Sequence, residues 1–301
     1  MQKVWNSRVL ILMCMPTIIF FLIFAYLPMP GLYLAFIDYN YTQGIFKSQF
    51  IGWDNFKFLV MSGDLWKLTF NTIAYNLAFI VLGNFMQIFV AILLNELRLK
   101  WFKKVSQTIM FLPHFISPVL IGLLAYNILS YDYGLLNSTI TALGFDPVKT
   151  YSNPHIWPFI IVVAYLWQST GYGSIIYFAS IMSLDTEIIE AAEIDGASAV
   201  QRIRYIILPW LKPTFIILLL FSLGGVLKGN FGLFYNLVGA NNTMLYETTD
   251  IIETYVFRAL MTNFNFSMGS AVSLYQSVFG FGIVLTANWL VRKFSPENSL
   301  F

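Results

Sequence analysis

Five acidic residues lie close together in the sequence, within residues 185–195. They are Asp185, Glu187, Glu190, Glu193 and Asp195. The three glutamates recur every third residue, which in a helix gives a slowly drifting acidic stripe. Ala191 and Ala192 leave the other side of such a helix thin, so another protein surface could approach it closely. A capped, solvated connection between two membrane spans is the alternative, and these residues alone leave both interpretations open.

A second set of polar side chains lies inside otherwise apolar stretches. These are Gln168, Tyr172, Lys228, Asn230, Tyr275 and Gln276. Amide and hydroxyl groups with aromatic faces, in a mostly apolar cavity, are the groups that bind sugars. An intramembrane lysine usually marks a pathway. The alternatives are hydrogen bonds between helices for the amides, and for Lys228 an early end of its helix that lets the amine reach the interface.

Little other chemistry is available in this chain. One cysteine, Cys14, excludes a disulfide framework, and two histidines, His114 and His155, offer little for a metal site, so we expect none. His114 lies between Pro113 and Pro118, where its ring could satisfy a carbonyl freed by a kink. The sequence contains no G-x-x-x-x-G-K-[ST] phosphate loop, so any ATP must be bound by a different chain. We therefore predict that the chain is not an enzyme and holds no cofactor.

Composition decides which elements position these side chains. Of 301 residues, 58% are hydrophobic and 11% are charged, whereas a soluble domain carries about 25% charged residues. About 20 apolar residues suffice for a helix to cross a bilayer, and a helix satisfies its own backbone there. The sequence predicts an all-α membrane protein whose six transmembrane helices form a single domain over residues 1–301. The predicted spans are residues 9–27, 73–94, 109–129, 157–182, 214–238 and 268–291.

The distribution of Lys and Arg predicts the orientation. With the N-terminus in the cytoplasm, the cytoplasmic segments hold Lys3, Arg8, Arg98, Lys100, Lys103, Lys104, Arg202, Arg204, Lys212, Arg292 and Lys293, eleven in all. The outer segments hold five, namely Lys47, Lys57, Lys67, Lys149 and Arg258. Positive charge accumulates on the cytoplasmic side of membrane proteins. Both termini are therefore predicted to be cytoplasmic.

The cytoplasmic segment 183–213, between the fourth and fifth spans, has the pattern of two short helices. Asp185 is a good N-cap for a helix over 186–194, and Gly196 suits the position that ends it. Ser198 and Gln201 form a capping box that opens a second helix. Pro209 and Pro213 are expected to close that second helix before the membrane.

The same segment resembles the EAA motif of the permease subunits of bacterial ABC importers. The matching residues are Glu190, Ala191, Ala192, Asp195, Gly196, Ala197, Ile206, Leu208, Pro209 and Pro213. Ile203 stands where phenylalanine is common, and Thr186 where proline is common. The resemblance implies a type I ABC importer permease fold, in which this loop docks on a cytoplasmic ATPase and couples it to the spans. The coupling residues it implies are Glu190, Ala191, Ala192, Asp195, Gly196, Ala197, Leu208 and Pro209.

Two outer segments are similar to carbohydrate-importer permeases. Residues 31–36, 52–56 and 71–72 resemble the first outer loop of sugar permeases of the maltose type, and residues 249–258 resemble a block in permeases for complex oligosaccharides and polysaccharides. The resemblance implies a multi-pass subunit of the bacterial inner or plasma membrane. Its implied partners are a second, homologous permease in a heterodimer, two ATPase subunits that bind ATP and Mg²⁺, an extracytoplasmic solute-binding protein and an oligosaccharide.

Two alternatives differ from an oligosaccharide permease. One is an ABC importer permease for a solute other than a sugar. The other is a membrane-embedded sugar transferase, which needs a cluster of acids or a metal site near the membrane face. The fifteen acidic residues lie outside the predicted spans, and the five of segment 185–195 belong to the EAA-like motif. This placement disfavours the transferase.

Overall fold

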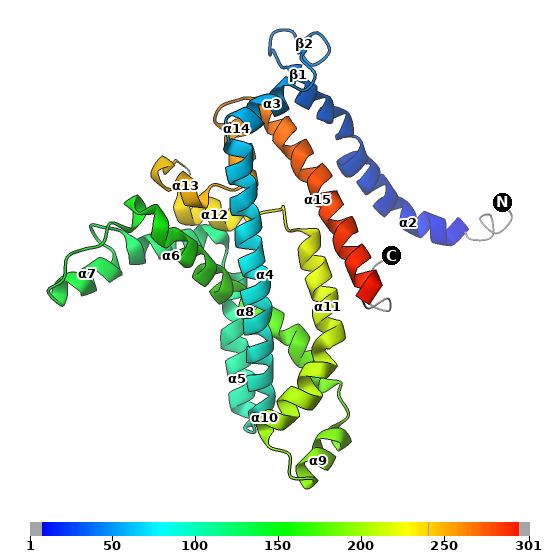
Figure 1. The fold of residues 1–301 in the computed structure, drawn as a ribbon, viewed down its shortest axis with the longest axis vertical. Coiled ribbons are helices and arrows are strands. Elements are labelled where there is room, and N and C mark those ends of the chain that lie inside the picture. Colours follow the sequence, from blue (N-terminus) through cyan, green and yellow to red (C-terminus); the bar gives the residue numbers. More distant parts are fainter. Residues whose placement is uncertain (1–7, 240, 295–301) are drawn as a thin grey trace. The chain divides into compact units, whose positions relative to one another are not determined.

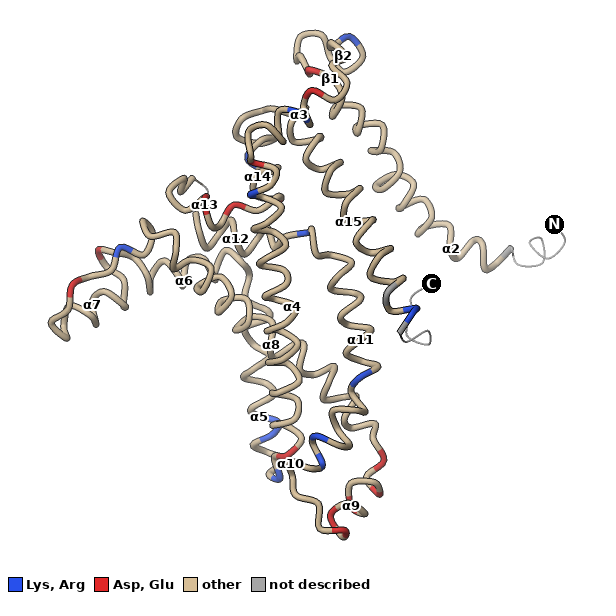
Figure 2. The backbone as a smooth tube through the Cα atoms, in the orientation of Figure 1, with Lys and Arg blue, Asp and Glu red and all other residues tan. Residues whose placement is uncertain are grey.

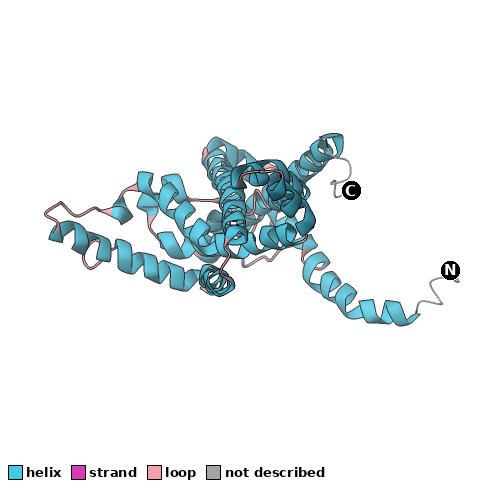
Figure 3. Cartoon of the chain, turned by 90° about the horizontal axis from the view of Figure 1, so that it is seen from below, coloured by secondary structure: helices cyan, strands magenta, loops and turns pink. Residues whose placement is uncertain are grey.

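The computed structural model describes residues 8–239 and 241–294. These residues are mostly helical (Figure 3). The chain folds as two compact units, one made of residues 1–65 and 256–275 and the other of residues 66–255 and 276–301.

The first unit contains the N-terminal helix and a small outer loop. Its elements are α2 (Arg8–Phe21), the π-helix η1 (Leu22–Tyr26), the 3₁₀ helix η2 (Met29–Phe36), the strands β1 (Ile37–Asp38) and β2 (Gln49–Phe50), and α3 (Asp54–Met61). The strands pair antiparallel, with Ile37 opposite Phe50. Buried Asn55 donates from Nδ2 to the carbonyl oxygens of Ala35 (2.9 Å) and Ile37 (3.3 Å). The Gly-Trp-Asp-Asn-Phe block is therefore the part of the sequence that fastens this loop.

The second unit holds most of the helices (Figure 1). Its helices are α4 (Asp64–Glu96), α5 (Lys100–Phe111), η3 (Leu112–Phe115), α6 (Pro118–Leu129), α7 (Leu135–Ala142), η4 (Thr150–Ser152), η5 (Pro154–Ile156), α8 (Trp157–Met182), α9 (Thr186–Ile194), α10 (Ala199–Arg202), the π-helix η6 (Ile203–Ile207), α11 (Leu208–Gly224), α12 (Phe231–Val238), η7 (Thr243–Leu245) and α13 (Tyr246–Thr249). Both α14 (Ile252–Met261) and α15 (Phe266–Phe294) run through the two units. Within the second unit α12 packs on α6, and α5 and α11 pack on α8.

Within the described residues, five helices are long and apolar enough to cross a membrane, or six if a bent pair counts as one span. The bent pair corresponds to the third predicted span, 109–129. Helices α5 with η3 and then α6 meet there at 97°. The bend follows from the sequence, because Pro113 and Pro118 each remove a backbone donor and Ser117 caps the new helix by accepting from Leu120 N.

The fifth predicted span, 214–238, is not one helix. Helix α11 ends at Gly224, and α12 begins only at Phe231. At its other end α11 continues from α10 through η6, so the prediction that Pro209 and Pro213 close the second short helix is wrong. Pro209 directly follows the π-helix η6, and the backbone donors lost at Pro209 and Pro213 do not end the helix.

The long helices α4 and α8 carry few charged residues, and those that occur lie toward the helix ends. Helix α8 contains none, and α4 carries only Asp64, Lys67 and Glu96, close to its two ends. Figure 2 shows Lys, Arg, Asp and Glu gathered around α9, α10 and the start of α5. Of the basic residues used to predict the orientation, Lys3 lies outside the described residues. The orientation itself stays a prediction.

Two apolar clusters form the core of the second unit. One surrounds fully buried Trp157, whose Nε1 donates to the carbonyl oxygen of Thr150 at 2.9 Å. The other is built from the last turns of α4 and α8 and the start of α11, and includes Tyr177 and Leu211. Glycines bring backbones together between helices: a Cβ on Gly171 would meet the carbonyl of Met110, and one on Gly122 that of Asn236.

We expect Gly171→Ala to destabilise the protein. The added methyl group collides with backbone rather than with a mobile side chain, and overpacking costs about 1–3 kcal/mol. Gly280→Ala is the matched control, because an added Cβ there meets nothing within 4 Å. The measurement is thermal unfolding of each purified variant in detergent. Equal unfolding temperatures for the two variants would contradict this packing argument.

Candidate functional site

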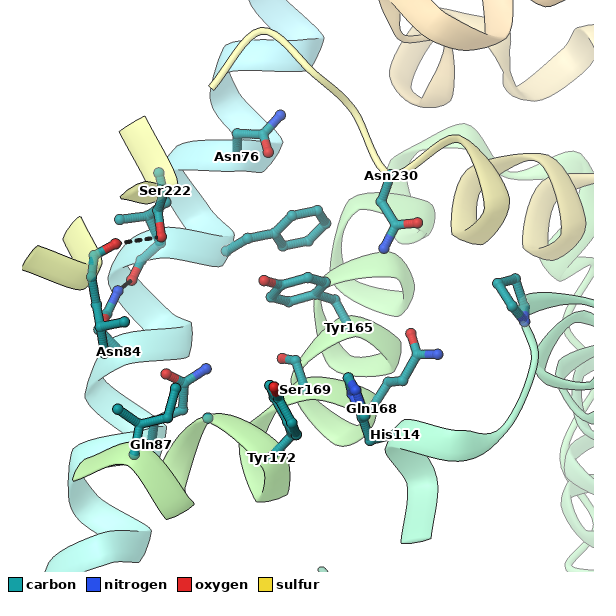
Figure 4. A pocket seen from close by; sticks show the side chains of 16 residues that line it. Asn76, Asn84, Gln87, His114, Tyr165, Gln168, Ser169, Tyr172, Ser222 and Asn230 are labelled. Carbon is teal, nitrogen blue, oxygen red and sulfur yellow. Dashed lines mark hydrogen bonds between the residues drawn. The ribbon is translucent and has the colours of Figure 1, made fainter. Parts of the chain in front are cut away.

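A cavity of about 560 Å³ lies within the second unit (Figure 4). Sixteen residues line it, from α4, η3, α6, α8, α11 and the segment that follows α11. They are Asn76, Phe79, Ile80, Asn84, Gln87, His114, Pro118, Tyr165, Gln168, Ser169, Tyr172, Gly173, Ile176, Leu218, Ser222 and Asn230. These lining residues include amides, hydroxyls and aromatic rings but neither a carboxylate nor a lysine or arginine. Such a lining suits a ligand rich in hydroxyl groups.

Helix α4 contributes three of the amides. Asn76, Asn84 and Gln87 fall on one face of the helix because they are separated by eight and three residues. Asn76 and Asn84 donate to backbone carbonyls one turn earlier, to Thr72 O at 2.9 Å and to Ile80 O at 2.7 Å. Their amide donors are thus used inside the helix, and Asn84 Oδ1 accepts a hydrogen bond from the Tyr177 hydroxyl.

The amide of Gln87 rests on the backbone of α8. A Cβ on Gly173 would collide with the amide group of Gln87. Glycine at this position therefore leaves the room that the amide occupies in the cavity wall. Neighbouring Gly171 allows α5 to approach α8, so the two glycines of this turn serve different purposes.

Stacked rings form two more parts of the wall. Phe79 lies on Tyr165 with centroids 3.9 Å apart and planes at 15°. His114 lies on Tyr172 with centroids 4.2 Å apart and planes at 8°. Stacking fixes the orientation of each ring, so each of the two tyrosines is held by a flat ring partner, Phe79 for Tyr165 and His114 for Tyr172.

The kink between η3 and α6 is satisfied by a side chain of another helix. Nε2 of Gln168 donates to the carbonyl oxygen of Ile116 at 3.1 Å. This is the role that the sequence suggested for His114, which instead stacks on Tyr172. Gln168 thus serves in a helix–helix hydrogen bond and in the cavity lining at once.

Asn230 stands where the fifth span is broken. Its Oδ1 accepts from Leu233 N at 3.2 Å and so caps α12, while the residue also lines the cavity. Beside it, a carboxylate oxygen of Glu253 accepts from Phe231 N at 3.2 Å. Burial raises the pKa of Glu253, and this rise is opposed by hydrogen bonds from Phe231, Gln276 and Gly229 and by the charge of Lys228.

The structure divides the candidate pathway residues into groups. Gln168, Tyr172 and Asn230 line one cavity. Lys228, which is exposed, and Gln276, whose Nε2 donates to Leu227 O at 2.7 Å, belong instead to the surroundings of Glu253. Tyr275 is half-buried and is not among the residues that line the cavity.

Sequence reasoning missed the three amides of α4. Their signal was available, because Asn76, Asn84 and Gln87 share one face of an otherwise apolar predicted span. Gln87 also explains why residue 173 is a glycine, because an added Cβ at Gly173 would collide with the Gln87 amide.

The acidic segment folds as predicted into a helix, α9, which begins at Thr186 and ends at Ile194. Asp185 caps it by accepting from Glu187 N at 3.0 Å. Gly196 has φ of 80°. Its N–H donates to Glu193 O at 3.0 Å and the N–H of Ala197 to Ala192 O at 2.9 Å, which is a complete Schellman ending.

Helix α9 exposes most of the EAA-like residues. Glu190, Ala191, Asp195 and Gly196 are exposed, as are Leu208 and Pro209 at the start of α11, whereas Ala192 and Ala197 are half-buried. The next short helix opens with the predicted capping box, in which Gln201 N donates to Ser198 Oγ at 3.4 Å and Ser198 N to Gln201 Oε1 at 2.7 Å. Both ends of α9 are therefore fixed by local hydrogen bonds while its surface stays open.

Residues 80–296 match the family described as the binding-protein-dependent transport system inner membrane component, and the chain belongs to that family. It is 34% identical, over 98% of this chain and 91% of the relative, to the polygalacturonan/rhamnogalacturonan transport system permease protein YteP of Bacillus subtilis. It is 30% identical, over 69% of this chain and 70% of the relative, to the trehalose/maltose transport system permease protein MalF of Thermococcus litoralis.

A solved structure shows the same fold. The chain superposes with a TM-score of 0.88 and 33% identity, covering 98% of both chains, on a subunit of a bacterial ABC transporter involved in the import of the acidic polysaccharide alginate. The same transporter has been crystallised with an alginate pentasaccharide-bound periplasmic protein. The chain is thus a multi-pass membrane protein with the type I ABC importer permease fold, and a component of a transporter rather than a catalytic enzyme.

Proposed function

We propose that this permease is the channel-forming subunit of an ATP-driven importer that moves oligosaccharides or polysaccharide fragments into the cytoplasm. The observation that carries the proposal is the cavity of amides, hydroxyls and stacked rings in an apolar helical unit. The names of its relatives support it, since they are permeases of transport systems for polygalacturonan and rhamnogalacturonan and for trehalose and maltose. A sugar presents many hydroxyls and flat apolar faces, which such a wall can hydrogen-bond and stack.

The cavity is our candidate for this subunit's part of the sugar path. Gln87, Gln168, Tyr172 and Asn230 would offer hydrogen bonds to hydroxyls, and the stacked rings would present apolar surface. Lys228, Tyr275 and Gln276 stay candidates for other stretches of the path. Each of these groups would bind weakly, since a single neutral hydrogen bond is worth only about 1 kcal/mol. A sugar held by such bonds can also be released.

The EAA-like loop is our candidate for the coupling element. Helix α9 with Gly196 behind it, followed by Leu208 and Pro209, would insert into a cleft of an ATPase subunit. Its exposed acidic and small residues and its locally fixed ends support this role. Glu190 is available for charge-assisted hydrogen bonds from a basic partner or from backbone donors.

The remaining partners follow from the family. We propose a second homologous permease, two cytoplasmic ATPase subunits that bind ATP and Mg²⁺, and an extracytoplasmic solute-binding protein that delivers the sugar. The membrane would be the bacterial inner or plasma membrane, with both termini of this chain in the cytoplasm.

The cavity assignment predicts that Gln87→Leu lowers sugar uptake without loss of assembly. The change keeps most of the side-chain volume but removes its hydrogen bonds, so uptake should fall roughly fivefold for a loss of about 1 kcal/mol. Asn127→Leu is the control, since Asn127 is an exposed amide on α6. Uptake and co-purification of the partner subunits are measured in proteoliposomes. Normal uptake by the Gln87 variant would place the sugar path elsewhere.

The coupling assignment predicts that Gly196→Val and Glu190→Lys leave the permease inserted but weaken ATPase binding or separate ATP hydrolysis from uptake. At Gly196 the cause is the positive φ, which costs a residue with a Cβ about 1 kcal/mol or more. No atom lies within 4 Å of an added Cβ there, so crowding is not a second cause. Sugar-stimulated hydrolysis and uptake are both measured with the binding protein present. If both variants hydrolyse and transport normally, this loop is not the coupling element.

The orientation predicts which sites an impermeant thiol reagent reaches from outside. In a Cys14→Ser background, cysteines at Ser152 and Asn242 should react and one at Lys103 should not. Labelling of whole cells or spheroplasts, with lysed cells as the control for reactivity, gives the answer. Reversed labelling would overturn the orientation.

A further inference from the structure

Helix α9 has few attachments to the rest of its unit. None of its residues is buried. Ile189 is half-buried against the cluster formed by Ala91, Tyr177 and Leu211. A helix so exposed can pass a force to the spans only through its few anchors and through its two connections along the chain.

A guanidinium group supplies an anchor of another kind. Arg202 lies at the end of α10 with its side chain only 16% exposed. Its Nη1 is 3.0 Å from Glu193 Oε1 on α9, and its Nη2 is 3.7 Å from Glu96 Oε2 on α4. Nη1 also lies 3.5 Å from the carbonyl oxygen of Ala197, just beyond the Schellman turn. One side chain thus touches α9, the turn that ends α9, and α4.

Electrostatics favours this arrangement. Glu96 is the last residue of α4, and Glu193 lies in the last turn of α9. A carboxylate at a helix C-terminus is opposed by the helix dipole, whereas a cation there is stabilised. Arg202 meets both C-terminal ends at once, and a planar guanidinium can serve two carboxylates from its two terminal nitrogens.

Helix α4 leads from this contact to the cavity. It is 33 residues long, and Gln87 lies nine residues before Glu96, which is about 14 Å along a helix. The same helix carries Asn76 and Asn84 of the lining. A displacement of the Glu96 end is therefore delivered to the cavity wall by a continuous helix.

We propose that Arg202 is a positioning residue that ties α9 to α4, so that ATPase closure moves the α4 wall of the cavity as well as the spans that flank the loop. This inference rests on the proposed coupling role of α9. It adds a third helix to the coupling, one that the chain does not connect directly to α9.

The test separates the two links of Arg202. Glu96→Gln breaks only the link to α4 and alters nothing on α9, whereas Arg202→Met breaks both. Arg98→Gln is the control, because it removes an exposed charge two residues from Glu96. The reporter is a cysteine at Asn76 in a Cys14→Ser background, whose rate of labelling by a thiol reagent is measured in the assembled complex, without nucleotide and with ATP trapped by vanadate.

We expect ATP trapping to change the labelling rate in the parent and in the Arg98 variant. In Glu96→Gln and Arg202→Met that change should shrink by about fivefold, at the low end of couplings between distant sites. More ATP should be hydrolysed per sugar imported, while co-purification with the ATPase stays normal. Arg202→Lys, which keeps the charge, should recover part of the response. Loss of the response without loss of ATPase binding is not what simple misfolding produces.

Two outcomes overturn the inference. One is a parent whose Asn76→Cys labelling does not respond to trapping, and the other is an unchanged response in Glu96→Gln, whatever Arg202→Met does. If Glu96→Gln and Arg202→Met behave normally while Glu190→Lys separates ATP hydrolysis from uptake, only the proposed link through Arg202 is refuted. If Glu190→Lys also leaves hydrolysis and uptake unchanged, the coupling role of α9 fails as well.

Discussion

The need to satisfy every backbone N–H and C=O within the apolar layer governs this structure. An unbroken helix meets it without help, and α4 and α8 do so over 33 and 26 residues. Where the described spans are interrupted, side chains supply partners for freed backbone groups, some of them from distant helices and some from local caps. Gln168 donates to Ile116 O at the kink before α6, and Gln276 donates to Leu227 O where α11 has ended. Glu253 and Asn230 accept from the free donors that open α12.

These side-chain hydrogen bonds at the helix interruptions also explain where the cavity lies. A side chain that reaches a freed backbone C=O or N–H must be polar and directed at a gap between helices. Gln168 and Asn230 meet those conditions and line the cavity as a consequence. An interruption in a span therefore creates both the space and the polar groups that a hydroxyl-rich ligand needs. Glycine adds to this, because Gly173 leaves space for the amide of Gln87.

The elements that the sequence predicts well are those controlled by local chemistry. The bounds of α9, its Asp185 cap, the capping box of Ser198 and the left-handed Gly196 all depend on residues within one or two turns. The apolar stretches were recognisable for the same reason. The 97° bend at residues 112–118 and the break at 225–230 were not, because proline and glycine mark an interruption without fixing its angle. Some of the partners that stabilise these interruptions also lie far away in the sequence, as Gln168 does from Ile116, 52 residues apart.

The long helices also set the mechanical properties of the protein. A span that is broken can bend at the break, so a push on α11 is partly absorbed near Gly224, before it reaches Asn230. Helix α4 has no such interruption between its charged end and the amides of the cavity. The stacked pair Phe79 and Tyr165, together with the hydrogen bond that the Tyr177 hydroxyl donates to Asn84, joins the α4 wall of the cavity to α8. Helices α4 and α8 both reach the cavity wall without a break, and Arg202 is the side chain that connects the charged end of α4 to α9.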